Sequence, residues 1–357
     1  MISRVARLGW ALLLVSMFAA GTASGAEFMF RAMVGERPVE GQALFWNSSQ
    51  MLLLARDGQL EQFDPRQATG GKMIAPEFIP YSMEETRQRL LQEFGPGFRV
   101  TTAGHHYVVH AANQSSDWAS RFEALYRQFH SYFRVRGFQL EEPRVPLVAV
   151  VFPTRDDYIT FVRGQGIKFQ ESMLGHYDPQ SNRVLMYDQS RSTGADETLE
   201  TIIHEATHQT AYNVGLHSRV AVTPRWLVEG LAMMFEVEGV YGNSLGQGRE
   251  HRVHPGRLAD FRSHVAATGG KGLIRRIVAS DQAFHSDAIA AYGSAWALSF
   301  YLSETRPRQY EAYLKLTADR PPLANYPPKE RLDDFASQFG GDLVQLESDL
   351  LRWIERL

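Results

Sequence analysis

Residues 198–212 read Thr198-Leu-Glu-Thr-Ile-Ile-His-Glu-Ala-Thr-His-Gln-Thr-Ala-Tyr212, and the rest of the chain is organised around them. They contain the pattern H-E-x-x-H. In a helix, His204 and His208 are one turn apart, so their rings project from the same face and can share one metal ion. Glu205 lies about 100° around such a helix, close enough to contact a water on that metal. The stretch therefore predicts a helix that carries a metal site.

The same stretch also has an apolar side, formed by Leu199, Ile202, Ile203 and Ala206. This pattern is typical of a helix that packs on a core and turns its polar stripe toward a cleft. H-E-x-x-H fixes only three positions, so the alternative is a solvated helix face carrying two unrelated histidines. A second element downstream weighs against that alternative.

This second predicted helix reads Thr223-Pro-Arg-Trp-Leu-Val-Glu-Gly-Leu-Ala-Met-Met-Phe-Glu236. Thr223 is a suitable N-cap, and Pro224 stands at the first helical position, where a missing N–H costs nothing. Glu229 lies amid apolar residues. Arg225 is one turn before it, so a surface ion pair is one interpretation. We favour Glu229 as a third metal ligand, because two His and one Glu leave one position open, as in catalytic zinc sites.

Together, His204-Glu-Ala-Thr-His208 and Trp226-Leu-Val-Glu-Gly-Leu-Ala232 resemble the gluzincins of the peptidase-MA-like superfamily. The closest resemblance is to the bacterial group known as domain of unknown function 1570. The spacing from His208 to Glu229, 229 − 208 = 21 residues, is within the range such enzymes use. The likeness covers roughly Arg99 to the C-terminus. It implies the fold of a zinc-dependent hydrolase and supplies no substrate.

Metzincins, another class with H-E-x-x-H, are excluded. They carry Gly three residues and His six residues after the second histidine, where this chain has Ala211 and Val214. Gluzincins often orient a metal-bound histidine with an acid one turn beyond the third ligand. That position holds Met233 here, so we expect the orienting group elsewhere. Glu200, one turn before His204, is the candidate.

The predicted mechanism uses one Zn²⁺ per chain, held by His204, His208 and Glu229, although the same ligands could hold other divalent ions. Zinc lowers the pKa of a bound water from near 16 to roughly 7. Glu205 takes the water proton and passes it to the leaving amine. Related families carry a tyrosine at the far wall of the cleft. This resemblance implies that Tyr292 hydrogen-bonds the developing oxyanion. A core tyrosine with a satisfied hydroxyl is the alternative.

The N-terminus, residues 1–26, has the pattern of a secretory signal peptide. Arg4 and Arg7 precede an apolar run from Leu8 to Ala20, which is short for a membrane span. Small residues before Ala26 predict cleavage near that residue, and an uncleaved anchor is the alternative. We therefore expect a periplasmic or secreted protein with no stable membrane span after cleavage.

Composition excludes several classes of partner and site. The net charge of −3 gives no basic excess to neutralise phosphates, so nucleic acid is not an expected partner. The absence of cysteine excludes disulfides and thiolate metal sites. Hydrophobic content of 44% and charged content of 22% are ordinary globular values.

The order of predicted elements indicates an α+β fold. We expect a small β-rich module over 27–75, a linker and helix over 76–98, and a zincin-like metallopeptidase domain over 99–357. In that domain, a mixed sheet and helices precede the active-site helix, and a mostly α-helical subdomain follows it. Within the module, Asp57-Gly58 predicts a hairpin turn, and Gly70-Gly71 marks the exit.

Three further segments carry expectations about the site. Residues 98–110 are predicted as one strand, whose His105, His106 and His110 are more typical of hydrogen-bonded histidines than of ligands. Residues 183–187 are predicted as an edge strand that pairs with an extended peptide substrate, or as a hairpin that only closes the sheet. Residues 239–255 form a polar loop, in which His251 is an oxyanion candidate that nothing selects.

The predicted function is therefore that of an exported zinc-dependent peptidase. Its partner would be a peptide or protein substrate, with cell-envelope and cell-wall peptides left open. The alternative is a non-catalytic exported binding or assembly protein with a vestigial or structural metal site. Glu205 argues against that alternative, because a structural site does not need this carboxylate.

Overall fold

The computed structural model describes residues 23–24, 28–114, 117–167, 169, 173–188, 195–242 and 248–357, without the side chains of 23–24 and 195–198. It divides into two compact units. The first contains residues 1–95, 144–147 and 178–182, and the second contains 96–143, 148–177 and 183–357. Two sheets and a helical C-terminal part confirm the α+β class. The predicted domain boundaries stay a prediction.

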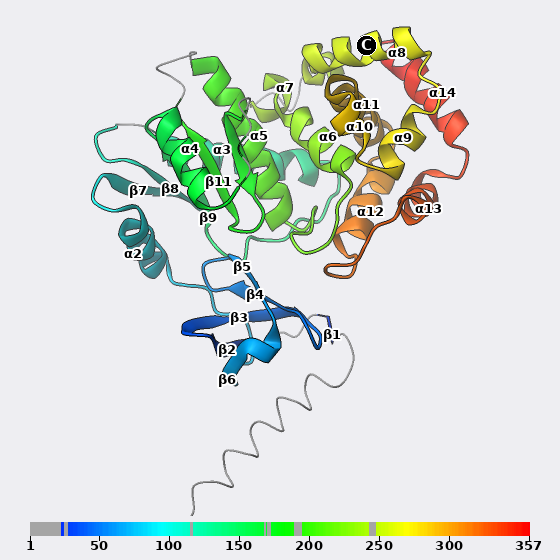
Figure 1. Ribbon diagram of the computed structural model, residues 1–357. Helices are drawn as coiled ribbons and strands as arrows, with labels where there is room; N and C mark the ends of the chain where they lie inside the picture. Colours follow the sequence, from blue (N-terminus) through cyan, green and yellow to red (C-terminus); the bar gives the residue numbers. More distant parts are fainter. Residues whose placement is uncertain are drawn as a thin grey trace, which may run out of the picture. The chain divides into compact units, whose positions relative to one another are not determined.

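The first unit is built on a six-stranded sheet in the order β5-β4-β3-β2-β6, with β1 paired to β3 (Figure 1). Its strands are β1 (Ala23–Ser24), β2 (Met29–Val34), β3 (Arg37–Trp46), β4 (Met51–Ala55), β5 (Leu60–Phe63) and β6 (Ala68–Ala75). The Asp57-Gly58 turn between β4 and β5 is confirmed, and Gly58 has φ +88°, the left-handed region that favours glycine. Apolar residues alternate inward to form the core of the sheet. They are Phe30, Ala32, Val39, Ala43, Trp46, Met51, Leu53 and Phe63.

One part of this sheet differs from the expectation. Gly70-Gly71 does not mark the exit of the module, because both residues lie inside β6, which pairs antiparallel with β2. The register shifts twice along this pair, as glycine-rich strands allow. Pairing to the free edge of β2 outweighs the low strand propensity of glycine. The short strand β1 lies inside the predicted signal peptide, and Ala26 lies outside the described residues.

The helix after the sheet, α2 (Met83–Phe94), begins with Ser82 as its N-cap. The Glu85 N–H donates to Ser82 Oγ, and the Ser82 N–H donates to Glu85 Oε2 at 2.8 Å. This capping box satisfies two of the donors that a helix N-terminus leaves free.

The second unit contains a five-stranded sheet in the order β10-β11-β9-β8-β7. The strands are β7 (Phe98–Ala103), β8 (His106–Ala111), β9 (Leu147–Phe152), β10 (Gly175–Asp178) and β11 (Arg183–Tyr187). Every residue of β9 is buried, as its continuous apolar sequence predicts for a central strand. The single strand predicted over 98–110 is wrong. It is a hairpin, because Gly104 with φ +51° allows a tight turn between β7 and β8.

The predicted substrate strand is also corrected. Residues 183–187 form β11, which lies between β10 and β9 and pairs parallel with β9. Its hydrogen-bonding groups are therefore used on both sides, and it cannot accept a further strand. The edge strand of the sheet on this side is β10, and a further strand can be added to a sheet only at its edge.

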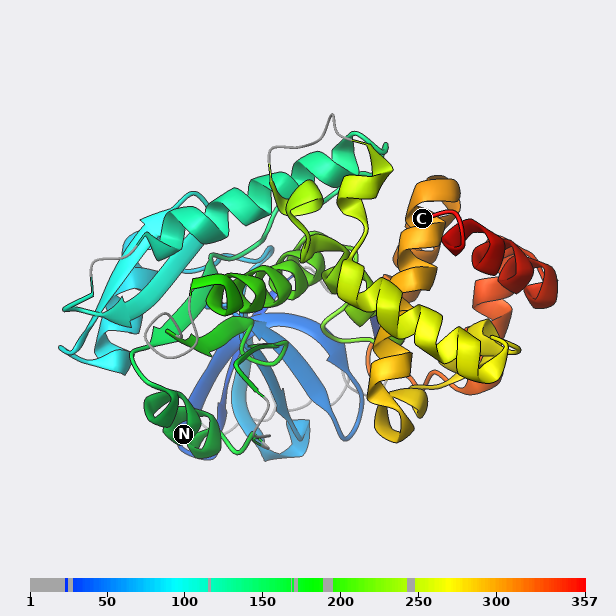
Figure 2. The same ribbon diagram turned by 90° about the horizontal axis from the view of Figure 1, so that it is seen from above.

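Helices make up the rest of the second unit (Figure 1). They are α3 (Trp118–Arg134), α4 (Arg155–Gly164), α5 (Ala195–Asn213), α6 (Arg225–Phe235), α7 (Glu238–Tyr241), α8 (Pro255–Thr268), α9 (Leu273–Ala279), α10 (Ala283–Ser286), α11 (Ala288–Thr305), α12 (Pro307–Ala318), α13 (Pro328–Phe339) and α14 (Leu343–Ile354); single 3₁₀ turns are η1 (Pro65–Gln67), in the first unit, and η2 (Arg249–Arg252). Figure 2 shows the yellow-to-red helices α8 to α14 gathered beside the five-stranded sheet and not on its faces. In the described part of the chain, no helix is long and apolar enough to cross a membrane.

Two contacts position α5 and α6. Ile202 and Ala206 of α5 join the buried core that includes Val151 of β9 and Met186 of β11, so the apolar side of the helix is fixed to the sheet. Helix α6 packs on both α5 and α11. A Cβ on Gly230 would stand 2.2 Å from Ser299 Oγ, so only glycine allows this close approach of α6 to α11.

The predicted start of α6 is wrong by one residue. Pro224 is the N-cap, α6 begins at Arg225, and no side chain of the cap hydrogen-bonds the helix. The capping acceptor comes instead from a distant segment, because the Arg225 N–H donates to Asp281 Oδ1 at 3.0 Å. A carboxylate at this position also matches the positive end of the helix dipole.

Candidate metal centre

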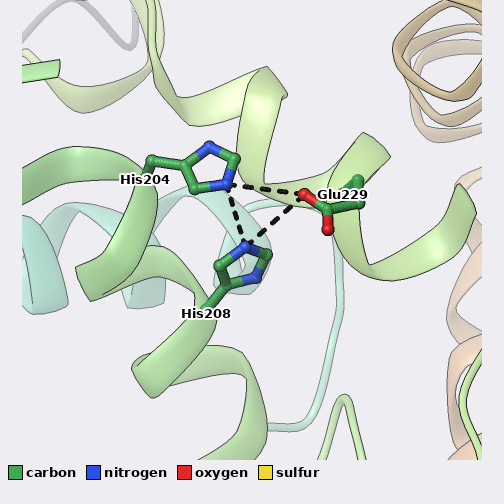
Figure 3. A group of neighbouring side chains, drawn as sticks. All are labelled: His204, His208 and Glu229. Atoms are coloured by element: carbon green, nitrogen blue, oxygen red, sulfur yellow. Dashed lines mark hydrogen bonds and ion pairs between the residues drawn. The ribbon is translucent and has the colours of Figure 1, made fainter. Parts of the chain in front are cut away.

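Helices α5 and α6 bring together the side chains of His204, His208 and Glu229 (Figure 3). The Nε2 atoms of His204 and His208 are 2.9 Å apart. Glu229 Oε2 lies 3.5 Å from the His204 nitrogen and 3.7 Å from the His208 nitrogen. Within the described ranges this is the only group of three or more His, Asp or Glu side chains placed to hold a metal ion.

The donor set fits a zinc ion. Donors at zinc-ligand distances of about 2.0–2.1 Å in a tetrahedron are about 3.3 Å apart. The three separations of 2.9, 3.5 and 3.7 Å bracket that value. Two imidazoles and one carboxylate leave a fourth position for water or substrate, which is the donor set of catalytic and not of structural zinc sites.

The pKa values of the two histidines are shifted in opposite directions. Burial opposes protonation of both, but ion pairs with Glu229 and Glu236 raise the pKa of His204 well above its ordinary value. Burial and the adjacent charge on His204 lower the pKa of His208 to about 4. When it is protonated, His204 Nε2 can donate to His208 Nε2 at 2.9 Å or to Glu229 Oε2 at 3.5 Å. A metal that binds both nitrogens must release this proton.

Glu229 faces the two histidines and also forms the ion pair with Arg225 that the sequence offered as the alternative. Its Oε2 faces the histidines, while Oε1 lies 3.4 Å from Arg225 Nε in an ion pair one helical turn long. Burial alone would raise the pKa of Glu229, but hydrogen bonding to His204 and the charges of the histidines and Arg225 lower it to about 2. The carboxylate is thus ionised, as a metal ligand must be.

Glu205 lies on the same helix and is held by the edge strand. The Tyr177 N–H of β10 donates to Glu205 Oε2 at 2.6 Å. Burial raises the pKa of Glu205, against the effect of the neighbouring charge on His204 and of this hydrogen bond. A raised pKa suits a carboxylate that accepts a proton and passes it on near neutral pH.

The group that orients His204 was not found from the sequence. Met233, one turn beyond Glu229, is buried and apolar, and Glu200 is exposed with no recorded contact to His204 among the described residues. Glu236, seven residues after Glu229, accepts from His204 Nδ1 at 2.6 Å. This contact fixes the tautomer that leaves Nε2 for a metal. A spacing of seven residues returns to the same face of a helix, and that was the available signal.

His254 holds Glu236 from the other side. Its Nε2 lies 2.8 Å from Glu236 Oε2, and its Nδ1 accepts from the Arg257 N–H at 3.3 Å, so His254 is the N-cap of α8. Since Nδ1 accepts, Nε2 carries the proton and donates to Glu236. A continuous chain of hydrogen bonds therefore runs from His204 through Glu236 and His254 to the start of α8.

Tyr292 lies near the centre on α11, half-buried. Its hydroxyl oxygen accepts from Arg225 Nη2 at 2.8 Å. Burial and the charge of Glu229 raise the pKa of Tyr292, so the phenol keeps its proton. Because the oxygen accepts from Arg225, the proton is available to donate elsewhere. The oxyanion role of Tyr292 stays a prediction.

The other histidines that the sequence singled out are His105, His106, His110 and His251, and each has contacts of its own. His106 Nδ1 is 3.1 Å from Glu123 Oε2, and His110 Nδ1 donates to the Ala111 carbonyl at 3.2 Å. His105 lies 3.5 Å from Glu123 Oε1. His251 is exposed in η2 and lies 3.7 Å from Glu250 of its own turn. These contacts explain each ring as a hydrogen-bonding or surface side chain.

Residues 198–324, which include all three candidate ligands, match the family described as "Protein of unknown function (DUF1570)". The chain is related to this group, as the sequence predicted. The match covers about a third of the chain and carries no activity. No curated protein sequence matches the chain.

Solved structures show a more distant likeness. An M1 zinc metallopeptidase from Deinococcus radiodurans aligns with 13% identity and a TM-score of 0.40, over 94% of this chain and 61% of that enzyme. A mutant of that enzyme bound to a Tyr-Ser-Ala substrate aligns with the same identity and TM-score, over 94% of this chain and 60% of that chain. The chain thus spans less than two thirds of the length of these metallopeptidases.

Proposed function

We propose that this protein is an exported zinc-dependent peptidase of the gluzincin type. The observation that carries the proposal is the arrangement of His204, His208 and Glu229, whose donor atoms lie 2.9 to 3.7 Å apart with a base, Glu205, on the adjoining helix position. Glu205 supports catalysis in particular, because a structural zinc site needs four closed ligands and no base.

Each residue has a separate task in this proposal. A bound zinc ion would supply a water of lowered pKa and polarise the scissile carbonyl. Glu205, held by the Tyr177 N–H, accepts a proton from the attacking water and delivers it to the leaving amine. Glu236 keeps the Nε2 lone pair of His204 directed at the metal position. Tyr292 keeps its proton and can donate it in a hydrogen bond to the developing oxyanion.

The position of the edge strand β10 favours a peptide as the substrate. Among the described strands, β10 is the edge strand on this side of the sheet, and its Tyr177 N–H donates to the proposed base. An extended peptide that paired with β10 would be bound through main-chain hydrogen bonds, which tolerate many side-chain sequences. The scissile bond would then lie beside Glu205. Export to the periplasm or the medium rests on the signal pattern of residues 1–26 and is part of the proposal.

Metal content per chain tests the proposal first. Purified wild type is expected to bind one equivalent of zinc, and Glu229→Ala to bind it far more weakly. Incubation of the zinc-loaded protein with a mixed peptide library, followed by mass spectrometry, is expected to show cleaved products that a chelator abolishes. Zinc binding without any cleavage would favour the non-catalytic binding protein. No zinc binding after reconstitution would contradict both.

A further inference from the structure

Arg225 contacts the third candidate ligand and the proposed oxyanion donor together. Its Nε lies 3.4 Å from Glu229 Oε1, and its Nη2 donates to Tyr292 Oη at 2.8 Å. The guanidinium carbon lies 5.0 Å from the ring centroid of Phe284, within the range of a cation–π contact. The charged group is therefore held from three directions beside the metal centre.

The backbone of Arg225 is fixed as well. Its N–H donates to Asp281 Oδ1, and both oxygens of Asp281 accept from Arg331, at 2.8 and 3.1 Å. Asp281 is thereby used by the helix N-terminus and by Arg331. The backbone contacts and the side-chain contacts to Glu229, Tyr292 and Phe284 together restrain the guanidinium of Arg225. Binding of a ligand therefore costs it little further conformational entropy.

Part of the Arg225 guanidinium has no partner among the described residues. The Arg225 side chain is 36% exposed, and in the part of the chain that the structure describes no contact is recorded for Nη1. A guanidinium has five N–H donors in a rigid plane, of which Glu229 and Tyr292 use two. The donors that remain, on Nη1 and Nη2, form a fork at the tip of the side chain. Such a fork matches the two oxygens of a carboxylate.

We propose that Arg225 binds a carboxylate group of the substrate next to the scissile bond. The inference rests on the proposed function and names a substrate class: peptides that carry a negative charge near the cleaved bond. That charge is either the free C-terminal carboxylate of a short peptide or the side chain of Asp or Glu. In either case Arg225 orients the substrate by two parallel hydrogen bonds while Tyr292 and Glu229 hold the guanidinium in place.

Hydroxamates that carry a second acid test this recognition without turnover. The probes are succinic and glutaric monohydroxamates and their carboxamide analogues, in which only the carboxylate is replaced. Calorimetric titration of the zinc-loaded full chain is expected to show the acid binding on the order of tenfold more tightly than the amide, as charge-assisted hydrogen bonds predict. Arg225→Gln should abolish the difference, and Arg225→Lys should restore part of it, because an ammonium supplies charge without the fork.

Arg352→Gln is the matched control. It removes the same charge from an exposed position on α14, and the preference for the acid should persist. Equal binding of acid and amide by wild type would overturn the proposal, as would a preference that survives in Arg225→Gln. Zinc content is measured for every variant. If both Arg225 variants lost zinc, the comparison of acid and amide binding by wild type would still test whether a carboxylate is preferred.

Peptide cleavage separates the two sources of the carboxylate. If the C-terminus is bound, amidation of the peptide should lower kcat/KM by about tenfold or more in wild type but not in Arg225→Gln. If an acidic side chain is bound, kcat/KM should fall by the same factor when a Glu next to the cleaved bond of the peptide substrate is replaced by Gln. Absence of all cleavage would contradict the proposed function while the hydroxamate titration still judged the role of Arg225.

Discussion

Two histidine-rich regions of this protein lead to different chemistry. In α5, His204 and His208 are four residues apart on a helix, and their Nε2 atoms lie 2.9 Å apart. In β8, His106 and His110 are also four residues apart, but four residues of strand span about 13 Å. Residue type and spacing are the same in both regions. Only the rise per residue allows one pair, and not the other, to share an ion.

The carboxylates of the two regions differ in the same way. Glu229 reaches the helical histidines from a second helix and leaves one side of the centre open. Glu123 is closed by three donors, namely the His105 N–H at 2.9 Å, His106 Nδ1 at 3.1 Å and Arg127 Nε at 3.2 Å. A carboxylate with no unfilled position serves stability, whereas one that faces an open position serves binding.

Removal of one histidine from each region should have the largest effect. His208→Ala is expected to lose both zinc and turnover, because two ligands remain and neither is enough for a tight site. His106→Ala is the matched change on the strand and should keep one zinc per chain. Zinc content after dialysis, with circular dichroism to verify folding, checks both. Zinc loss in a folded His106→Ala protein would refute the distinction between the regions.

Glu205→Gln should separate catalysis from metal binding at the helical region. We expect zinc to stay bound and turnover to fall by about 10²–10⁴-fold, the usual contribution of a general base. The amide still accepts the Tyr177 N–H through its oxygen, so the position of β10 should be kept. Zinc content and peptide cleavage are measured on the same preparation. Undiminished hydrolysis would show that the base is another group.

The hydrogen-bond chain behind His204 should tune the metal affinity. Glu236→Gln and His254→Asn are each expected to weaken zinc binding by about 10–100-fold. Asn at position 254 can still cap α8 but is too short to reach Glu236, so it tests the contact apart from the cap. Competition with a chromophoric chelator measures the zinc affinity. If both variants bound zinc as tightly as wild type, the hydrogen bonds through Glu236 and His254 would not be what holds His204.

The closed carboxylate, Glu123, should affect only the stability of the protein, and this is the smallest of the expected effects. Glu123→Gln is expected to lower the free energy of unfolding by about 1–3 kcal/mol, because buried donors lose their charged acceptor. Burial raises the pKa of Glu123, but hydrogen bonds from His106, His105 and Arg127 outweigh it and lower the pKa from 4.5 to about 2.

The pH dependence of this effect has a defined sign. The stabilisation from Glu123 is present above pH 4.5 and lost as the pH falls toward 2, since the unfolded chain takes up the proton first. Glu123→Gln should therefore flatten the fall of stability in this window. Urea unfolding at pH 7 and pH 3.5 measures the difference. An unchanged pH profile would contradict the assigned role, and zinc content should equal that of wild type.

Local sequence patterns predicted much of this structure. The helical stripe of Leu199, Ile202, Ile203 and Ala206 predicted α5, and its H-E-x-x-H motif predicted two rings on one face, because helical periodicity depends on neighbours within one turn. The turn at Gly58 was predicted for the same reason. Glu229 was found because an acid amid apolar residues is costly unless something binds it.

Contacts between distant segments decided the rest. Strand order makes β10 and not residues 183–187 the edge, and sequence alone does not state which strands pair. Asp281 caps α6 in place of Thr223, and Glu236 with His254 holds His204, because each acceptor is brought from far along the chain by packing. The sequence by itself therefore determined the candidate ligands and the helices that bear them. The tertiary structure decided how those ligands are oriented and which strand faces them, since orientation arises only where separate elements meet.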